Sequence, residues 1–110
     1  MVESVGDHVE EVVVGDVVVP SFLAQCGDCG DCESEGSIMC GKLPYKPVGM
    51  PRDGTTRFTD AEGAVVHGFL GGASSFSEYT VADIAHVVKV DPAIPPEKAC
   101  LLSCGVSTGK

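Results

Sequence analysis

The chain has 110 residues, six of them cysteine, and carries a formal net charge of −9 at pH 7. This length predicts one domain with a modest core, and that core is mostly aliphatic because tryptophan is absent and aromatic residues make up only 5% of the chain. The acidic charge argues against binding to nucleic acid or to an anionic membrane surface, because it would neutralise neither phosphates nor acidic headgroups.

Valine-rich runs punctuated by Gly-Asp pairs open the chain and predict short strands. The runs lie at 2–5, 12–14 and 17–20, with predicted turns at Gly6-Asp7 and Gly15-Asp16 between them. A cysteine-rich loop follows. Residues 43–56 then predict an irregular segment, because prolines recur along them.

The second half of the chain predicts a hairpin, further strands and one helix. Residues 57–59 and 64–67 flank a polar four-residue turn, as hairpin arms do. Alternation at 76–82 and the apolar run at 84–90 predict strands. A helix begins at Pro95-Pro96-Glu97 and is expected to end at Gly105. The whole predicts a mainly β domain with a short C-terminal helix.

Four cysteines fall within fifteen residues, in the spacing C-x2-C-x2-C-x7-C. They are Cys26, Cys29, Cys32 and Cys40. Four thiolates can surround one tetrahedral Zn²⁺ with Zn–S bonds of about 2.3 Å and leave no coordination position open. Such a site folds a loop and does no chemistry itself. The spacing therefore predicts a structural zinc lobe at 22–42.

Three other interpretations of the cysteines are weighed against zinc. A secreted disulfide framework would require a signal peptide, and the acidic N-terminus does not resemble one. Bacterial ferredoxins share C-x2-C-x2-C but place a fourth cysteine, followed by proline, where this chain has Gly36. Four unrelated thiols are disfavoured by the dense spacing. Reduced cysteines without an export signal predict a cytoplasmic protein.

The cysteine loop, the segment 76–81 and the segment 100–109 together resemble the zinc-dependent medium-chain alcohol dehydrogenases, and most closely their plant alcohol-dehydrogenase-like branch. These segments read Phe-Ser-Glu-Tyr-Thr-Val and Cys-Leu-Leu-Ser-Cys-Gly-Val-Ser-Thr-Gly. The resemblance covers essentially the whole chain and implies part of a GroES-like β-barrel catalytic domain with a four-cysteine zinc lobe. It implies oxidation of a small alcohol to an aldehyde by a homodimeric enzyme, with a catalytic Zn²⁺ polarising the alcohol oxygen and NAD taking the hydride.

Individual site residues follow only from this resemblance. Cys104 matches one of the two cysteines that, with a histidine, hold the family's catalytic zinc. Thr108 matches a residue that lies against the nicotinamide, and Phe22 and Leu70 match residues of the substrate channel. Without the resemblance, Thr108 reads as a helix-start cap, Phe22 and Leu70 as core residues, and Cys100 and Cys104 as small buried apolar residues.

The family pattern also places the remaining catalytic-zinc ligands before residue 1 and the nucleotide-binding domain after residue 110. We therefore expect an incomplete GroES-like catalytic domain over 1–110, without the nucleotide-binding domain, that does not oxidise alcohols by itself. Two alternatives stay open. One is a non-catalytic zinc-binding fragment or paralogue, and the other is a fragment of the related S-(hydroxymethyl)glutathione (formaldehyde) dehydrogenases.

Overall fold

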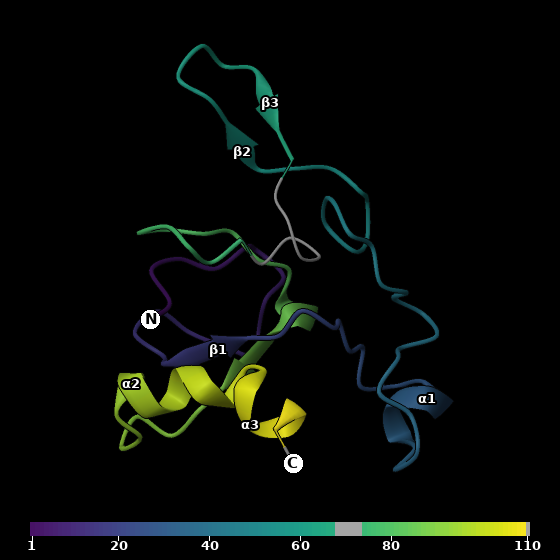
Figure 1. The fold of residues 1–110 in the computed structure, drawn as a ribbon. Helices are drawn as coiled ribbons and strands as arrows, with labels where there is room; N and C mark the ends of the chain where they lie inside the picture. Colours follow the sequence, from purple (N-terminus) through teal and green to yellow (C-terminus); the bar gives the residue numbers. More distant parts are fainter. Residues whose placement is uncertain (68–73, 110) are drawn as a thin grey trace. The chain divides into compact units, whose positions relative to one another are not determined.

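The computed structural model describes residues 1–67 and 74–109, which divide into two units. Unit 1 consists of Met1–Ser21 with Val87–Lys110, and unit 2 consists of Phe22–His86. Figure 1 shows that each unit contains short helices and strands joined by long irregular segments. Among the residues described, the strands form two antiparallel sheets of two strands each. The described residues are mostly non-helical, and short helical segments lie near the C-terminus, as the sequence predicts.

Unit 1 is built on a ladder between β1 (Val18–Pro20) and β4 (Val87–Lys89). The strands run antiparallel, and Val19 lies opposite Val88. Val19 is buried, since a β-branched side chain packs well on the inner face of a sheet. At the end of the ladder, Lys89 Nζ lies 2.8 Å from Asp16 Oδ2, and this hydrogen bond holds the pKa of Asp16 below its usual range. The strand predicted at 17–20 is therefore confirmed.

The helical end of unit 1 consists of α2 (Pro96–Ala99), a 3₁₀ turn η2 (Cys100–Leu102) and α3 (Gly105–Thr108). Pro96 occupies the first turn, where its missing N–H group costs nothing. Ala99 is buried, and the Ser103 hydroxyl donates a hydrogen bond to the Pro20 carbonyl. The predicted helix is confirmed, but Gly105 does not end the helical segment. The break falls at Cys104, whose φ is −149°, and Gly105 begins α3.

Near the N-terminus, the structure has turns in place of the strands that were predicted from the valine runs. Residues 2–5 and 12–14 form no strand. Val2 instead donates its N–H to the Asp16 carbonyl and accepts from the Gly15 N–H, both at 2.9 Å. The predicted turn at Gly15 is confirmed, with φ at +93°. These strand predictions failed because β propensity forms a strand only beside a partner edge.

Unit 2 contains α1 (Gly30–Glu33), the hairpin β2 (Phe58–Thr59) and β3 (Val65–Val66), and a 3₁₀ turn η1 (Ile84–His86). The predicted hairpin is confirmed. The Asp60 N–H donates to the Ala64 carbonyl at 2.9 Å, and the Asp60 side chain accepts from the Ala64 N–H at 2.8 Å. Gly63 closes the turn with a φ of +84°, which glycine adopts without strain.

Two strand predictions in the second half need correction. Residues 76–82 form no strand: residues 76–79 are bends, and Phe76 and Tyr79 are 104% and 73% exposed. The Ser77 hydroxyl donates to the Tyr79 carbonyl at 2.6 Å, so the local hydrogen bonds are those of a turn. The strand predicted at 84–90 is shorter in the structure. Its first residues form the turn η1, and only Val87–Lys89 pair with β1. Among the described residues, no helix is long and apolar enough to cross a membrane.

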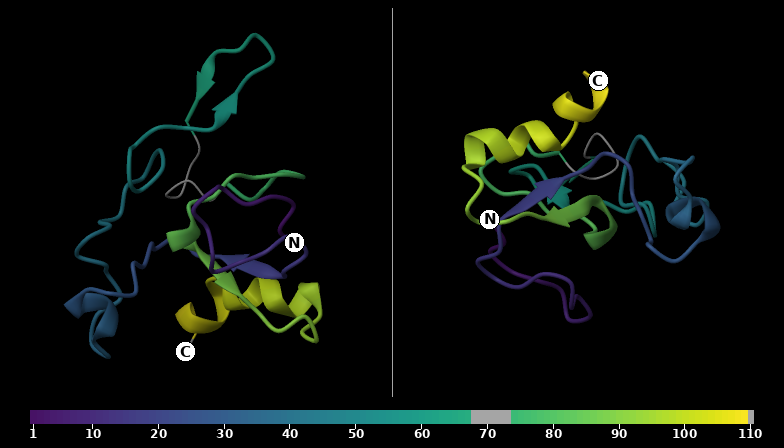
Figure 2. Two further views of the ribbon diagram at one scale, coloured as in Figure 1. Left: turned by 180° about the vertical axis from the view of Figure 1, so that it is seen from behind. Right: turned by 90° about the horizontal axis from the view of Figure 1, so that it is seen from below.

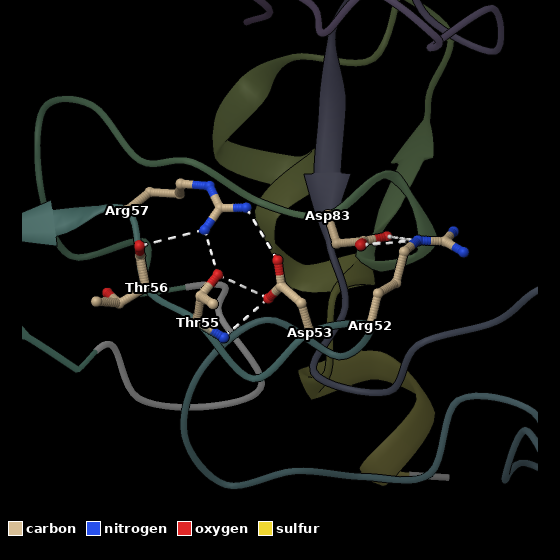
Figure 3. A network of polar contacts seen from close by, with 6 residues as sticks. All are labelled: Arg52, Asp53, Thr55, Thr56, Arg57 and Asp83. Carbon is tan, nitrogen blue, oxygen red and sulfur yellow. Dashed lines mark hydrogen bonds and ion pairs between the residues drawn. The ribbon is translucent and has the colours of Figure 1, made fainter.

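A polar network closes the irregular segment near residue 50 (Figure 3). The Asp53 carboxylate accepts hydrogen bonds from the Thr55 hydroxyl at 2.7 Å, the Thr55 N–H at 2.8 Å and Arg57 Nη2 at 3.2 Å. Gly49 fits against this loop because a Cβ there would lie 2.4 Å from the Gly54 carbonyl oxygen. Arg52 Nε lies 2.9 Å from the Asp83 carboxylate and so joins two parts of unit 2 that are far apart along the chain.

We predict that Asp53 titrates well below an ordinary aspartate. The Thr55 hydroxyl and N–H, followed by the Arg57 guanidinium, lower the pKa of Asp53 to about 2. A lowered pKa stabilises the fold above the unfolded value near pH 4, and this contribution is lost as pH falls through about 2. The Thr55 amide chemical shift, followed against pH by NMR, should have its midpoint near the lower value.

The control is Asp53→Asn, in which this titration of the Thr55 amide should disappear. A midpoint near 3.9, the value of a solvated aspartate, would show that the network of Figure 3 does not hold the carboxylate.

Candidate metal centre

The four loop cysteines converge in unit 2. Their sulfur atoms all lie within 4.8 Å of one another. Two of the sulfur–sulfur distances, Cys26 to Cys32 and Cys29 to Cys40, measure 3.9 Å. In a tetrahedral zinc–thiolate site, bonds of about 2.3 Å put neighbouring sulfurs about 3.8 Å apart. The cluster therefore has the dimensions of a site for one tetrahedral metal ion. All four cysteines are free thiols and not disulfides.

A single helical turn positions two of the four sulfurs. Cys29 is the N-cap of α1 and Cys32 lies within the helix, so the two side chains share one face at i, i+3 spacing. The Glu33 N–H donates to the Cys29 carbonyl at 3.0 Å and closes the turn. Gly27, with φ at +75°, reverses the chain between Cys26 and Cys29. Figure 2 shows α1 as a short turn within an otherwise irregular segment.

The fourth sulfur belongs to the core of unit 2. Cys40 is 4% exposed and packs in a buried cluster with Ala24 and Leu43. The Leu43 N–H donates a hydrogen bond to Cys40 Sγ at 3.2 Å. Hydrogen bonds of this kind orient a metal-binding sulfur and stabilise its thiolate. The other three cysteines are half-buried against the same cluster, so the candidate metal centre and this core are one structure.

The thiols of the cluster differ in how readily they lose a proton. Hydrogen bonding from the Cys32 backbone lowers the pKa of Cys29 to about 6. A hydrogen bond to the Asp28 carboxylate raises the pKa of Cys26 to about 12. A divalent cation would thus meet a ready thiolate at Cys29 and displace a proton from Cys26. Four protein sulfurs would complete a tetrahedral shell, with no position for a substrate.

An ion pair outside the sulfurs joins the two ends of the loop. Lys42 Nζ lies 2.9 Å from Asp28 Oδ2, and both side chains are more than half exposed. The pKa of Lys42 is raised by the hydrogen bond to Asp28, and the charges of Asp28, Cys26 and Cys29 add to this rise. Neither charged residue was predicted from the sequence, although Asp28 and Lys42 each stand two residues after a cysteine, and this position was the available signal.

The remaining predicted site residues lie outside this cluster. Phe22 is 41% exposed and contacts the Tyr45 ring edge-on at a centroid distance of 6.4 Å, so its expected core packing is wrong. Leu70 lies outside the described residues. Cys104 Sγ is 3.4 Å from Thr108 Oγ1 in unit 1. Both Cys100 and Cys104 are exposed, so their interpretation as buried apolar residues is wrong. Thr108 ends α3 and does not cap its start.

We predict that Lys42→Met weakens metal binding at the cluster by about three- to tenfold at low ionic strength. A divalent ion with four thiolates carries a net charge of about −2, which the Lys42 ammonium partly offsets. Because the side chain is more than half exposed, the effect should shrink in high salt. Competition with a chelator at low and high salt measures both the weakening of metal binding and its dependence on salt.

The matched control is Lys46→Met, which removes the same charge four residues further along the chain. Equal weakening by the two variants, or weakening that is independent of salt, would contradict a direct electrostatic role for Lys42.

Comparison with known proteins gives a family match over most of the chain. The model of the alcohol dehydrogenase GroES-like domain matches residues 1–92. Similar proteins include alcohol dehydrogenase-like 7, 4 and 1 of Arabidopsis thaliana, which are 59%, 51% and 49% identical to the chain. Each alignment covers 99% of this chain. The chain spans 28%, 29% and 28% of the lengths of those three relatives.

Proposed function

The chain belongs to the alcohol dehydrogenase family with a GroES-like domain, and we propose that its four-cysteine cluster is the structural zinc site of a zinc- and NAD-dependent alcohol dehydrogenase. The observation that carries this proposal is the convergence of four free thiols within 4.8 Å. An all-thiolate, tetrahedral donor set of this size suits Zn²⁺ or an iron–sulfur centre, and the cysteine spacing favours zinc.

Zinc would stabilise unit 2 more strongly than its apolar contacts do. Among the described residues, the buried cluster consists of Ala24, Cys40 and Leu43, and a fully buried leucine contributes about 1.5–3 kcal/mol. Structural zinc binding in small thiolate sites contributes about 10–16 kcal/mol. The metal is therefore the dominant stabilising interaction of the Cys26–Leu43 segment, and its role is to hold this lobe in shape.

The proposed reaction is oxidation of a small-molecule alcohol to an aldehyde. A bound catalytic zinc would supply a Lewis acid that lowers the pKa of the alcohol oxygen, and bound NAD would supply a hydride acceptor. Cys104 is proposed as one ligand of that zinc and Thr108 as a contact of the nicotinamide. Their 3.4 Å contact supports this pair of roles, because a residue that holds the metal and a residue that contacts the nicotinamide would have to lie close together for hydride transfer.

The structural zinc site and the reaction site are separate in this proposal. The cluster has four protein ligands, so it has no free position at which an alcohol could bind. Cys104 contributes a single thiolate, and the other ligands of a catalytic metal would come from elsewhere in the assembled enzyme. Reduced cysteines throughout the chain agree with a reducing compartment such as the cytoplasm.

We predict that the purified chain binds one zinc ion through the four loop cysteines. Metal analysis should find a ratio near one, and Cys32→Ser should lower it and loosen the lobe, because three thiolates leave the shell incomplete. Cys100→Ser is the matched control, since Cys100 is an exposed free thiol in unit 1, and it should retain the metal. Iron with visible charge-transfer absorption would contradict the zinc assignment.

A second prediction tests the reaction. In a chimera, these residues replace the matched segment of an active alcohol dehydrogenase of the family. Cys104→Ser should then reduce alcohol-dependent NADH formation by at least about a hundredfold, since loss of a ligand disables the polarising metal. Cys100→Ser should retain activity. If Cys104→Ser keeps full activity in this chimera, Cys104 does not hold the catalytic zinc and the catalytic part of the proposal fails.

A further inference from the structure

The loop near residue 50 contains the one Asp-Gly step of the sequence, Asp53-Gly54, and the sequence has no asparagine. At such a step the backbone nitrogen of the glycine can attack the side-chain carboxyl carbon of the aspartate, because glycine has no Cβ to obstruct the approach. A Cβ placed on Gly54 would meet nothing within 4 Å, and the Asp53 side chain is 46% exposed. Water and open space therefore surround the reacting atoms.

Hydrogen bonds hold both reacting groups of this step. The Gly54 N–H donates to the Met50 carbonyl at 2.8 Å. The Asp53 carboxylate accepts from the Thr55 N–H, the Thr55 hydroxyl and Arg57 Nη2, and Figure 3 shows it turned toward these donors. Because the nitrogen and the carboxylate are each held by other groups, the attack requires this loop to open locally.

We propose that Asp53-Gly54 is an isoaspartyl modification site, which the surrounding hydrogen bonds keep closed in the folded loop and which local opening exposes to reaction. The proposal is independent of the metal centre and of alcohol oxidation. It gives the polar network of Figure 3 a chemical role, which is to protect the covalent backbone of an exposed loop.

The rearrangement needs no oxidant or reductant. The Gly54 nitrogen attacks Cγ of the neutral Asp53 carboxyl, the new C–N bond closes a succinimide ring, and the amide proton leaves with the carboxyl hydroxyl as water. Water then adds to one of the ring carbonyls. Opening at Cγ restores aspartate, whereas opening at the backbone carbonyl carbon of Asp53 leaves the chain running through the side chain. The water lost is regained, so isoaspartate has the mass of aspartate.

The charge of the Asp53 carboxylate also opposes the first step, because ring closure needs the neutral carboxyl. Thr55, followed by the Arg57 guanidinium, lowers the pKa of Asp53 from 3.8 to about 2. At any pH above both values, the neutral fraction is then roughly sixtyfold smaller than in a solvated aspartate. Arg52, the neighbouring cation, binds Asp83 instead. The same donors thus orient the carboxylate and keep it ionised.

Isoaspartate would disrupt the network that suppresses its formation. Its carboxylate is attached directly to Cα, and the backbone gains one carbon before Gly54. The carboxylate is thereby displaced from the Thr55 and Arg57 groups that held it. The product also presents a free α-carboxylate in an exposed loop, which is the group that a carboxyl methyltransferase acting on isoaspartate would esterify.

The test measures isoaspartate at position 53 in the purified chain during incubation at about pH 5, above both pKa values of Asp53. Chromatography with electron-transfer fragmentation distinguishes isoaspartate from aspartate of the same mass. A synthetic peptide of residues 50–57 gives the rate without the folded network. The folded chain should react at least about fiftyfold more slowly than the peptide, since the smaller neutral fraction alone gives a factor of this size.

Two variants remove donors from the Asp53 carboxylate. Thr55→Val and Arg57→Gln should each raise the rate at least about fivefold, because each lost donor lets the pKa of Asp53 rise. Thr55→Ser is the matched control, since it keeps the hydroxyl, and it should stay slow. Lys46→Gln removes a cation that takes no part in the contacts of Figure 3, and it should also stay slow. Exchange protection of the Asp60 amide reports whether the hairpin of each variant remains folded.

Two results would overturn the proposal. One is isoaspartate forming in the folded chain as fast as in the peptide while the Asp60 amide stays protected. The other is a rate in Thr55→Val and Arg57→Gln that equals the rate in Thr55→Ser. If a variant loses its hairpin, the comparison of the unaltered chain with the peptide decides, because it needs no substitution. Metal content, measured in parallel, tests only the proposed function.

Discussion

The constraint on which unit 2 depends is the convergence of four cysteine sulfurs that could hold one divalent metal ion. These sulfurs lie within 4.8 Å of one another in a segment that has one helical turn and no strand. The apolar cluster beside them contains a single large aliphatic side chain, that of Leu43. In the proposed zinc-bound form, coordination would supply most of the free energy that orders this loop. The N–H···S bond to Cys40 and the Lys42–Asp28 ion pair adjust a geometry that the four sulfurs determine.

Unit 1 is organised differently, by a short ladder and a helical end. The β1–β4 pair brings residues near position 20 to residues near position 87, and the Ser103 hydroxyl joins the helical end to Pro20. Two residues with proposed catalytic roles, Cys104 and Thr108, are in contact at α3. Structural metal binding and the proposed chemistry thus belong to separate units of the chain.

The metal centre could be predicted from the sequence because its information is local. Spacing along one loop is enough to place four sulfurs around an ion, and Gly27 provides the required turn. The hairpin at β2 and β3 was predictable for the same reason, since Asp60 and Gly63 form its turn within the loop. The Lys42–Asp28 pair was missed, because the nearness of each residue to a cysteine does not show that the two approach each other when the loop closes.

Strands at 2–5, 12–14 and 76–82 were predicted wrongly because propensity and alternation do not provide a partner. A strand needs an adjacent edge, and the order of residues along one segment does not reveal whether that edge exists. Phe76 illustrates the point: it begins the alternating segment that predicted a strand, yet its side chain is 104% exposed. The register of β1 against β4 likewise depends on residues far apart in sequence.

Amide hydrogen exchange, with and without a metal chelator, tests most directly whether the metal holds unit 2 together. The account predicts that chelation removes protection from the Glu33 and Leu43 amides, whose hydrogen bonds belong to the cluster. The amides of the β1–β4 ladder in unit 1 should keep their protection. Unchanged protection at Glu33 and Leu43 in metal-free protein would contradict the account, because the loop would then be ordered by contacts other than the metal.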